Sequence, residues 1–134
     1  RDLIQALARL KSNVDTAQFI PIQKAAAMAL TSDLSSVQEN NREFLSRMEL
    51  MYRILVESGF QLEKPRGTFY LWVKVPGGYS SMEFAEKLLL EAGIIVTPGN
   101  AFGSYGEGYF RIALTVSKER LQEAGKRLQT LSLD

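Results

Sequence analysis

An arginine in the middle of an otherwise uncharged stretch is the residue whose setting most suggests chemistry. From Tyr109 to about Val116 the sequence alternates as a strand does, which puts Arg111 on one face. The other face carries the apolar residues Phe110, Ile112, Leu114 and Val116. A guanidinium is a rigid fork of donors that suits a carboxylate or a phosphate. Taken alone, Arg111 is best interpreted as a structural residue that pairs with a carboxylate of its own chain, such as Glu107.

A glycine-rich loop from Pro98 to Gly108 precedes this strand and follows a short β-branched run at residues 94–96. A loop of this kind between two strands predicts a pocket-forming turn beside Arg111. Its glycines fit neither the dinucleotide-binding nor the Walker A spacing, because no strand–loop–helix order with a Gly-Lys-Ser/Thr end occurs. The stretch therefore offers one well-placed cation and a loop, and not a complete active site.

Composition narrows the function classes further. The 134 residues suffice for one domain with a real core, and 46% apolar with 23% charged residues is ordinary for a globular protein. The absence of cysteine and histidine excludes disulfides, thiol nucleophiles, histidine bases and most zinc sites. A net charge of +1 gives no reason to expect nucleic acid or a membrane surface as partner, and no apolar run has transmembrane length. Cytoplasmic residence is the default expectation.

Two helices are predicted at the start of the chain. The apolar spacing of residues 1–10 predicts an amphipathic helix, and residues 11–14 predict a polar break. Asp15 or Thr16 is a candidate N-cap for a second helix. Pro21 is expected in a first turn of that segment, where its missing amide hydrogen does no harm.

A third, long helix is predicted from Asp33 or Ser35 to Ser58, with Gly59 as its C′ residue. Apolar residues at helical spacing predict a buried stripe along it, made of Leu34, Val37, Phe44, Met48, Met51 and Leu55. The opposite face is predicted to be a solvated charge ladder with i,i+4 partners, made of Glu39, Arg42, Glu43, Arg47, Glu49 and Arg53.

Beyond this helix the spacing changes from helical to alternating. Strands are predicted at residues 60–63 and 68–75, separated by a turn. The second strand carries Phe69, Leu71, Val73 and Val75 on one face. Residues 94–96 and the Arg111 segment supply two further predicted strands.

Two more helices accompany these strands. Ser80 and Glu83 have the spacing of a capping box, at the start of a helix that is expected to end before Gly93. Ser117 is the expected N-cap of a last helix, inside which Gly125 is unfavourable by about 1 kcal/mol relative to alanine. The order β-β-α-β-β-α behind a long helix predicts an α+β fold, with a small antiparallel or mixed sheet covered by helices.

Several separated motifs resemble the C-terminal part of the fold-type I pyridoxal-phosphate aminotransferases. They are Gly67-Thr68-Phe69-Tyr70-Leu71-Trp72, then Pro98-Gly99 with Phe102-Gly103, then Gly106-Glu107-Gly108-Tyr109-Phe110-Arg111-Ile112. Their order and intervals are similar as well, and the resemblance covers essentially the whole chain. Residues 96–100 and 106–115 look most like the LL-diaminopimelate aminotransferase branch, with the aspartate and alanine aminotransferases close behind.

The resemblance implies roles for individual residues. Arg111 matches the arginine that binds the substrate α-carboxylate in a bidentate pair. The resemblance therefore favours substrate binding over a structural pairing with Glu107. Phe69 matches an aromatic residue beside the substrate, with a place in the core as the alternative. Phe102 and the Pro98-Gly99 turn match the loop at the rim of the pocket.

A further implication concerns the partner subunit. Ser12 and Asn13 match a segment that lies near the partner's active site in the family's homodimers. Helix capping is the alternative role for both residues.

The departures from the family concern the chemistry itself. The family depends on a lysine that binds pyridoxal phosphate, an aspartate on its pyridine nitrogen and a phosphate cup, all in a large domain that this chain lacks. No lysine here has the Ser/Thr-rich setting that precedes the family's cofactor lysine; the chain's lysines are Lys11, Lys24, Lys64, Lys74, Lys87, Lys118 and Lys126. The abrupt start suggests a piece of a longer protein, with residues 1–32 continuing from the cofactor domain and residues 33–134 forming the small domain.

The resemblance therefore predicts a pyridoxal-phosphate-dependent aminotransferase as the full-length protein. Its substrates would be an amino acid, with LL-diaminopimelate, glutamate or aspartate as candidates, and a 2-oxo acid. This chain would supply the α-carboxylate clamp and is predicted to be inactive alone. Two alternatives remain, an aminotransferase-like sensor domain of a transcription regulator and a non-catalytic interaction module.

Overall fold

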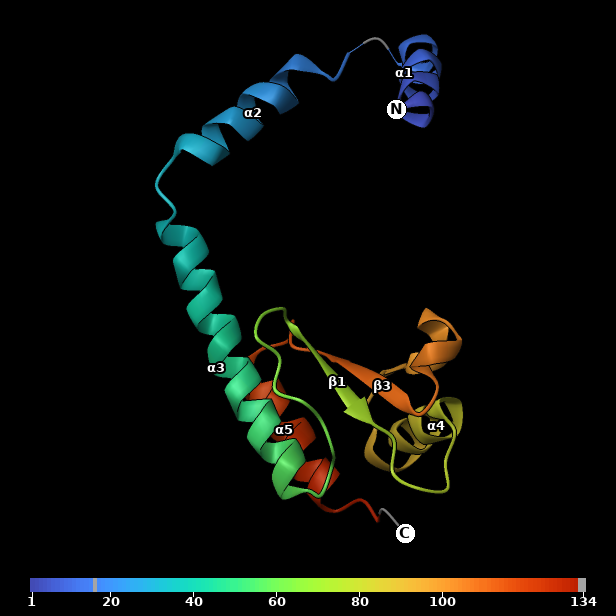
Figure 1. Ribbon diagram of the computed structural model, residues 1–134. Helices are drawn as coiled ribbons and strands as arrows, with labels where there is room; N and C mark the ends of the chain where they lie inside the picture. The colour runs from blue at the N-terminus through green and yellow to red at the C-terminus, as the bar shows by residue number, and fades with distance from the viewer. Residues whose placement is uncertain (16, 133–134) are drawn as a thin grey trace. The chain divides into compact units, whose positions relative to one another are not determined.

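The computed structural model describes residues 1–15 and 17–132, which form helices and a small antiparallel sheet (Figure 1). Thr16, one of the two candidate N-caps, lies outside the described residues. The described chain divides into two compact units, one covering residues 1–37 and one beginning at residue 38. No helix among the described residues combines the length and the apolar character needed to cross a membrane.

The first helix, α1 (Asp2–Val14), runs through the polar break predicted at residues 11–14. That prediction is wrong because the polar side chains there are satisfied within the helix. Ser12 Oγ and Asn13 Nδ2 both donate to the carbonyl oxygen of Arg9, at 2.9 and 2.8 Å. Such bonds to a carbonyl one turn back let serine and asparagine occupy the end of a helix.

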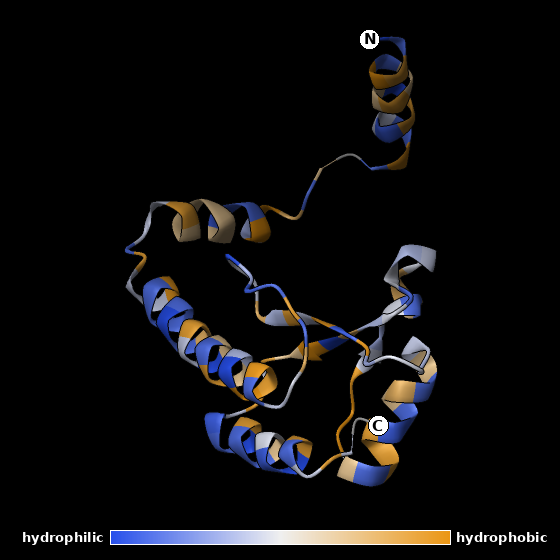
Figure 2. Ribbon diagram, turned by 60° about the horizontal axis from the view of Figure 1, so that its bottom comes forward, coloured by the Kyte–Doolittle hydropathy of each residue, from blue (hydrophilic) through white to orange (hydrophobic). Residues whose placement is uncertain are grey.

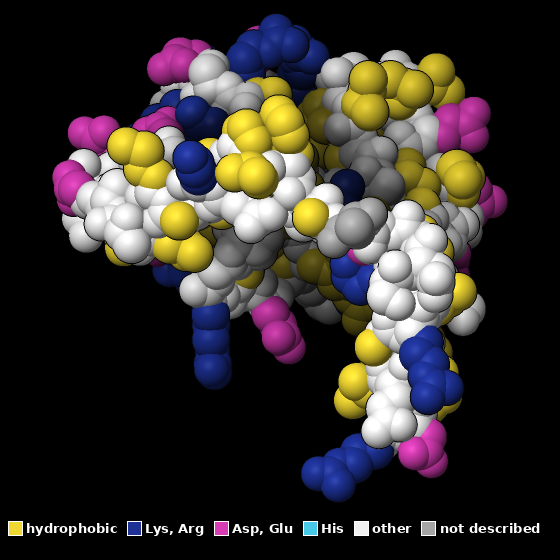
Figure 3. Space-filling view, turned by 90° about the horizontal axis from the view of Figure 1, so that it is seen from above, with side chains coloured by type: hydrophobic (Ala, Val, Ile, Leu, Met, Phe, Trp, Pro, Cys, Tyr) yellow, Lys and Arg dark blue, Asp and Glu magenta, His cyan; other side chains and the backbone are white. Residues whose placement is uncertain are grey.

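The second helix, α2 (Ile20–Thr31), has Pro21 in its first turn, as predicted. Its N-cap is Phe19, so the predicted cap at Asp15 is wrong. Neither α1 nor α2 has a buried residue, and Leu3 on α1 is 87% exposed. The space-filling view shows hydrophobic side chains at the visible surface (Figure 3).

The long helix α3 (Ser35–Glu57) buries part of its predicted stripe. Met48, Met51 and Leu55 lie in the core, as predicted. Leu34 precedes the helix and both it and Val37 are exposed, so the first part of the stripe is wrong. Gly59 has a φ of 87° and ends the helix as predicted, with the amide of Phe60 bonded to the carbonyl of Leu55 at 3.0 Å.

Helix α5 (Lys118–Gln129) lies beside α3 (Figure 1). A Cβ at Gly125 would lie 2.6 Å from Ile54 Cδ1, so the glycine permits the close approach of the two helices.

The charge ladder on α3 is only partly solvated. Arg47 is half-buried, forms the predicted pair with Glu43 at 2.8 Å, and also donates to the carbonyl of Leu114 at 3.2 Å.

The sheet is three-stranded, with β1 (Tyr70–Lys74), β2 (Thr97–Pro98) and β3 (Tyr109–Ala113) in the order β1-β3-β2. All pairs are antiparallel. The two other predicted strands are wrong, and the first amide of each segment bonds back to the helix before it, that of Phe60 to the Leu55 carbonyl at 3.0 Å. Residues 60–63 make a single bridge, from Leu62 to Val73, and the amide of Ile94 bonds back to the carbonyl of Leu88 at 3.0 Å.

The ends of the two longer strands also differ from the prediction. β1 begins at Tyr70, two residues later than expected, and β3 stops at Ala113. The amide of Leu114 still bonds to the carbonyl of Phe69 at 2.9 Å. Val116 is exposed, so its predicted place on the apolar face is wrong.

Helix α4 (Ser81–Ala92) begins with the predicted Ser80–Glu83 capping box and ends at Gly93 in the left-handed conformation. Apolar residues of α3, α4 and α5 form one core with one face of the sheet, and the ribbon coloured by hydropathy shows the mixed polar and apolar character of these helices (Figure 2). The sheet contributes Leu71, Val73, Phe110 and Ile112 to that core. The α+β prediction is confirmed; α3, α4 and α5 pack on one face of the sheet, and Arg111 lies on the other.

Candidate functional site

Arg111 stands at the centre of the open face of the sheet. It lies on the middle strand, opposite Trp72 on β1 and Thr97 on β2. Alternation along β1 puts Tyr70, Trp72 and Lys74 on this face, since Leu71 and Val73 point into the core. The face forms the floor of a broad cleft of about 1090 Å³, which the segment after Phe60 helps to line.

The guanidinium of Arg111 contacts two aromatic rings. Its Cζ lies 4.2 Å from the ring centroid of Tyr70 and 4.5 Å from that of Phe102. Its Nε is buried and has no hydrogen-bond partner among the described residues. A buried donor without a partner is costly and uncommon in folded proteins. Arg111 forms no hydrogen bond or ion pair with any described residue, so its positive charge has no polar partner in this part of the chain.

The structural pairing with Glu107 that the residues alone favoured is wrong. The carboxylate of Glu107 accepts hydrogen bonds from the backbone amides of Ser81, at 2.7 Å, and Gly108, at 3.1 Å. The Ser81 amide is the main reason that the pKa of Glu107 lies below its ordinary value. Glu107 therefore anchors its loop to the start of α4 and leaves Arg111 without it.

Ser81 holds the turn that leads into β3, and sequence reasoning missed it. Its side chain is fully buried. Its Oγ accepts from the amides of Gly108, at 2.8 Å, and Tyr109, at 3.3 Å, and lies 3.4 Å from the carbonyl oxygen of Gly106. In the sequence Ser81 only follows the N-cap Ser80, so no local signal marked it.

The glycine-rich loop folds into two short 3-10 turns, η1 (Gly99–Phe102) and η2 (Ser104–Gly106). Gly99 and Gly106 pack backbone to backbone, and a Cβ on either would overlap the carbonyl oxygen of the other. Glycine at both positions thus allows the loop to fold over the sheet. This fold places the Phe102 ring beside Arg111, 4.5 Å from its Cζ. The role of Phe102 at the rim of a substrate pocket stays a prediction.

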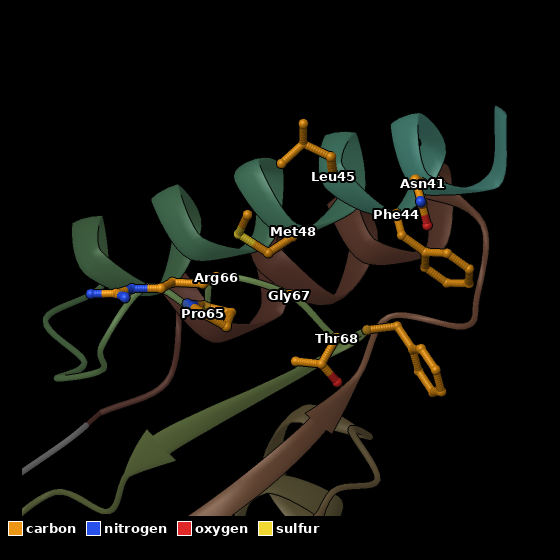
Figure 4. A pocket seen from close by; sticks show the side chains of 9 residues that line it. Asn41, Phe44, Leu45, Met48, Pro65, Arg66, Gly67 and Thr68 are labelled. Carbon is orange, nitrogen blue, oxygen red and sulfur yellow. The ribbon is translucent and has the colours of Figure 1, made fainter. Parts of the chain in front are cut away.

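Phe69 lies next to the site, in a different pocket. It stands just before β1 and lines a pocket of about 440 Å³ between α3 and residues 65–69, where Figure 4 shows Phe44 and Met48 opposite the loop. Its ring centroid is 4.4 Å from that of Tyr70 and 5.4 Å from that of Phe44. Phe69 is 38% exposed, so the core alternative is wrong.

Asn13 belongs to the first unit, and its side chain is occupied within α1. Its contact with substrate stays a prediction, as does that of Ser12.

Tyr70 was not predicted as a site residue. The alternation of β1 did contain the signal, since it puts Tyr70 on the face opposite Leu71.

Two helix N-termini, those of α4 and α5, offer no free site for the phosphate of the cofactor that the resemblance implies. A phosphate commonly binds at a helix N-terminus. The first turn of α4 is occupied by Ser80 and by Glu107, and that of α5 by Ser117. No group of three or more histidine, cysteine, aspartate or glutamate residues that could hold a metal occurs in the described part of the chain.

Comparisons with known proteins show which family the chain resembles. The family model for aminotransferase class I and II matches residues 1–128. An LL-diaminopimelate aminotransferase of Moorella thermoacetica is 51% identical over 128 residues, which is 96% of this chain and 33% of that protein. The same enzyme of Aquifex aeolicus is 45% identical over 133 residues, which is 99% of this chain and 34% of that protein.

Solved structures are similar as well. The aromatic aminotransferase from Pyrococcus horikoshii has a TM-score of 0.76 at 40% identity, over 81% of this chain and 30% of that one. A mutant aspartate aminotransferase of Thermus thermophilus has a TM-score of 0.83 at 27% identity, over 96% of this chain and 36% of that one. The chain thus spans about a third of the length of these relatives. With a family match that covers nearly all of its residues, the chain belongs to the aminotransferase class I and II family.

Proposed function

We propose that the full-length protein is a pyridoxal-phosphate-dependent aminotransferase, in which Arg111 binds the α-carboxylate of the substrate. The amino group moves between an amino acid and a 2-oxo acid. The observation that carries the proposal is that Arg111, on the sheet face away from the core, has no polar partner among the described residues. Membership of the family supports it.

Arg111 suits a carboxylate for a geometric reason. A guanidinium offers parallel N–H groups in one plane, and a carboxylate accepts two of them at once. Because β3 is the central strand and is paired on both sides, the base of the Arg111 side chain is fixed. A substrate held at its carboxylate has its Cα in a defined position, which is the condition for efficient proton transfer at that carbon.

The cofactor belongs to the part of the protein outside this chain. When bound, pyridoxal phosphate supplies the electron sink for the transfer. The described residues contribute the carboxylate site and the cleft around it, while the N-terminal amides of α4 and α5 are capped by their own chain. We therefore propose that this chain is inactive alone.

The relatives support a narrower substrate. Proteins named LL-diaminopimelate aminotransferase are 42–51% identical to this chain. We propose LL-diaminopimelate as the amino donor, with glutamate or aspartate as the other candidates. We also propose that the protein is a cytoplasmic homodimer in which Asn13 approaches the partner's site. Residues 1–32 would lead from the cofactor domain into a small domain of residues 33–134.

The test uses the full-length protein. Arg111→Ala is expected to lower kcat/KM by at least about 30-fold, since loss of one partner of a buried charge pair costs about 2 kcal/mol or more. Arg111→Lys keeps the charge, loses the fork and should fall between the two. Arg53→Ala, at an exposed position on α3, is the matched control and should leave kcat/KM unchanged.

A second substrate sharpens the test. The wild-type enzyme should prefer the amino acid over its α-carboxamide, and Arg111→Ala should lose most of that preference. An Arg111→Ala enzyme with kcat/KM within threefold of the wild type would overturn the proposal. A full-length protein without transaminase activity would instead favour the sensor or interaction-module alternatives.

A further inference from the structure

The two rings that contact Arg111 reach it from opposite flanks of its strand. Tyr70 belongs to β1, which pairs with one edge of β3. Phe102 ends the η1 turn that follows β2, which pairs with the other edge. Both rings present a face to the cation, because Cζ lies over each of them, at 4.2 and 4.5 Å from the centroids. The guanidinium is thus held by two elements that are far apart in the sequence.

Both rings are themselves held by neighbouring rings. The Tyr70 ring lies 4.4 Å from the Phe69 ring, which in turn lies 5.4 Å from Phe44 on α3. The Phe102 ring meets Trp72 edge to face at 5.6 Å. A ring that is packed on its far side keeps its orientation and so restricts the side chain that it contacts.

We propose that Tyr70 and Phe102 form an aromatic clamp that positions the guanidinium of Arg111 for the substrate carboxylate. This inference rests on the function proposed above. With Cζ over both rings and Nε buried, the N–H groups left for a carboxylate are those of the two terminal Nη atoms. The carboxylate therefore approaches in the guanidinium plane, where a bidentate pair forms.

The clamp makes a prediction about which part of Tyr70 matters. The contact is with the ring face, so the ring carries the effect and the hydroxyl does not. In the full-length enzyme, Tyr70→Phe should keep the wild-type KM, while Tyr70→Leu and Phe102→Leu should each raise KM for the amino acid about 10-fold. The preference for the amino acid over its α-carboxamide should fall by the same factor.

A double-mutant cycle separates positioning from a general structural role. If Tyr70 acts through Arg111, Tyr70→Leu should have no further effect on kcat/KM in an Arg111→Ala background. Tyr79→Leu is the matched control, because Tyr79 also has a cation over its ring, that of Lys87 at 5.5 Å, and neither residue lines the cleft that holds Arg111. It should leave KM and the carboxamide preference unchanged.

The outcomes distinguish the two proposals. If Arg111→Ala is strongly impaired and Tyr70→Leu lowers kcat/KM equally in both backgrounds, the clamp is overturned and the carboxylate site stands. If Tyr70→Phe is as impaired as Tyr70→Leu, the hydroxyl and not the ring face acts, which also overturns the clamp. If Arg111→Ala is unimpaired, the proposed carboxylate site is overturned, and the clamp that would position it is overturned as well. Thermal unfolding of each variant shows whether it is folded.

Discussion

Replacing Ser81 by alanine removes the buried hydroxyl that ties the start of α4 to the turn before β3. Its Oγ accepts from the amides of Gly108, at 2.8 Å, and Tyr109, at 3.3 Å. The Gly108 amide keeps a second acceptor in the carboxylate of Glu107, at 3.1 Å. The main loss is therefore the acceptor of one half-buried amide, that of Tyr109. A buried donor that loses its acceptor costs about 1–3 kcal/mol, so we expect the free energy of unfolding to fall by about 2 kcal/mol.

The assay is denaturant unfolding of the wild type and the variant, followed by far-ultraviolet circular dichroism. Ser36→Ala is the matched control, because Ser36 is an exposed serine on α3 and should change the free energy of unfolding by less than about 0.5 kcal/mol. A change below about 0.5 kcal/mol for Ser81→Ala as well would refute the reasoning. It would mean that water or a small shift of the turn satisfies the Tyr109 amide.

Three further predictions concern the loop, its acid and the cofactor. Gly99→Ala should destabilise the protein by about 3 kcal/mol, because its Cβ would overlap the Gly106 carbonyl. The control is Gly77→Ala, which should be near neutral because no atom lies within 4 Å of the added Cβ. Equal melting temperatures for the two variants would contradict this prediction. The hydrogen bond from the Ser81 amide lowers the pKa of Glu107 on folding. The Glu107 carboxylate therefore contributes its full stabilisation above the unfolded pKa of about 4.3, and this stabilisation is lost as the pH falls through the lower folded pKa. Glu107→Gln should thus flatten the fall of the melting temperature in acid, and an unchanged acid branch would count against the bond. The isolated chain, treated with pyridoxal phosphate and borohydride, should show no stoichiometric modification of one lysine by mass spectrometry; such a modification would put the cofactor's lysine in this chain.

Features set by neighbouring residues could be predicted from the sequence. The capping box of Ser80 and Glu83, the left-handed Gly93 and the buried Met48–Met51–Leu55 stripe all rest on spacings of a few residues. The alternation that separates Arg111 from Phe110 is equally local. These predictions are confirmed because helix caps and side-chain periodicity need no information from distant parts of the chain.

Features that depend on distant residues could not be predicted in this way. Strand ends follow from which amides the preceding helices take, as at Ile94, whose amide bonds to Leu88. The surroundings of Arg111 depend on Tyr70, about forty positions earlier in the chain, so the sequence alone favoured the wrong acid, Glu107. Only the resemblance to a family supplied the alternative role for that arginine.

The only tryptophan among the 134 residues, Trp72, lies directly opposite Arg111 in the sheet, with its ring stacked on Tyr109 at 5.7 Å. Indole emission responds to nearby charge and to the rings that pack against it. The intrinsic fluorescence of this chain therefore originates beside the guanidinium, and a carboxylate titration can be followed there without any added dye or label.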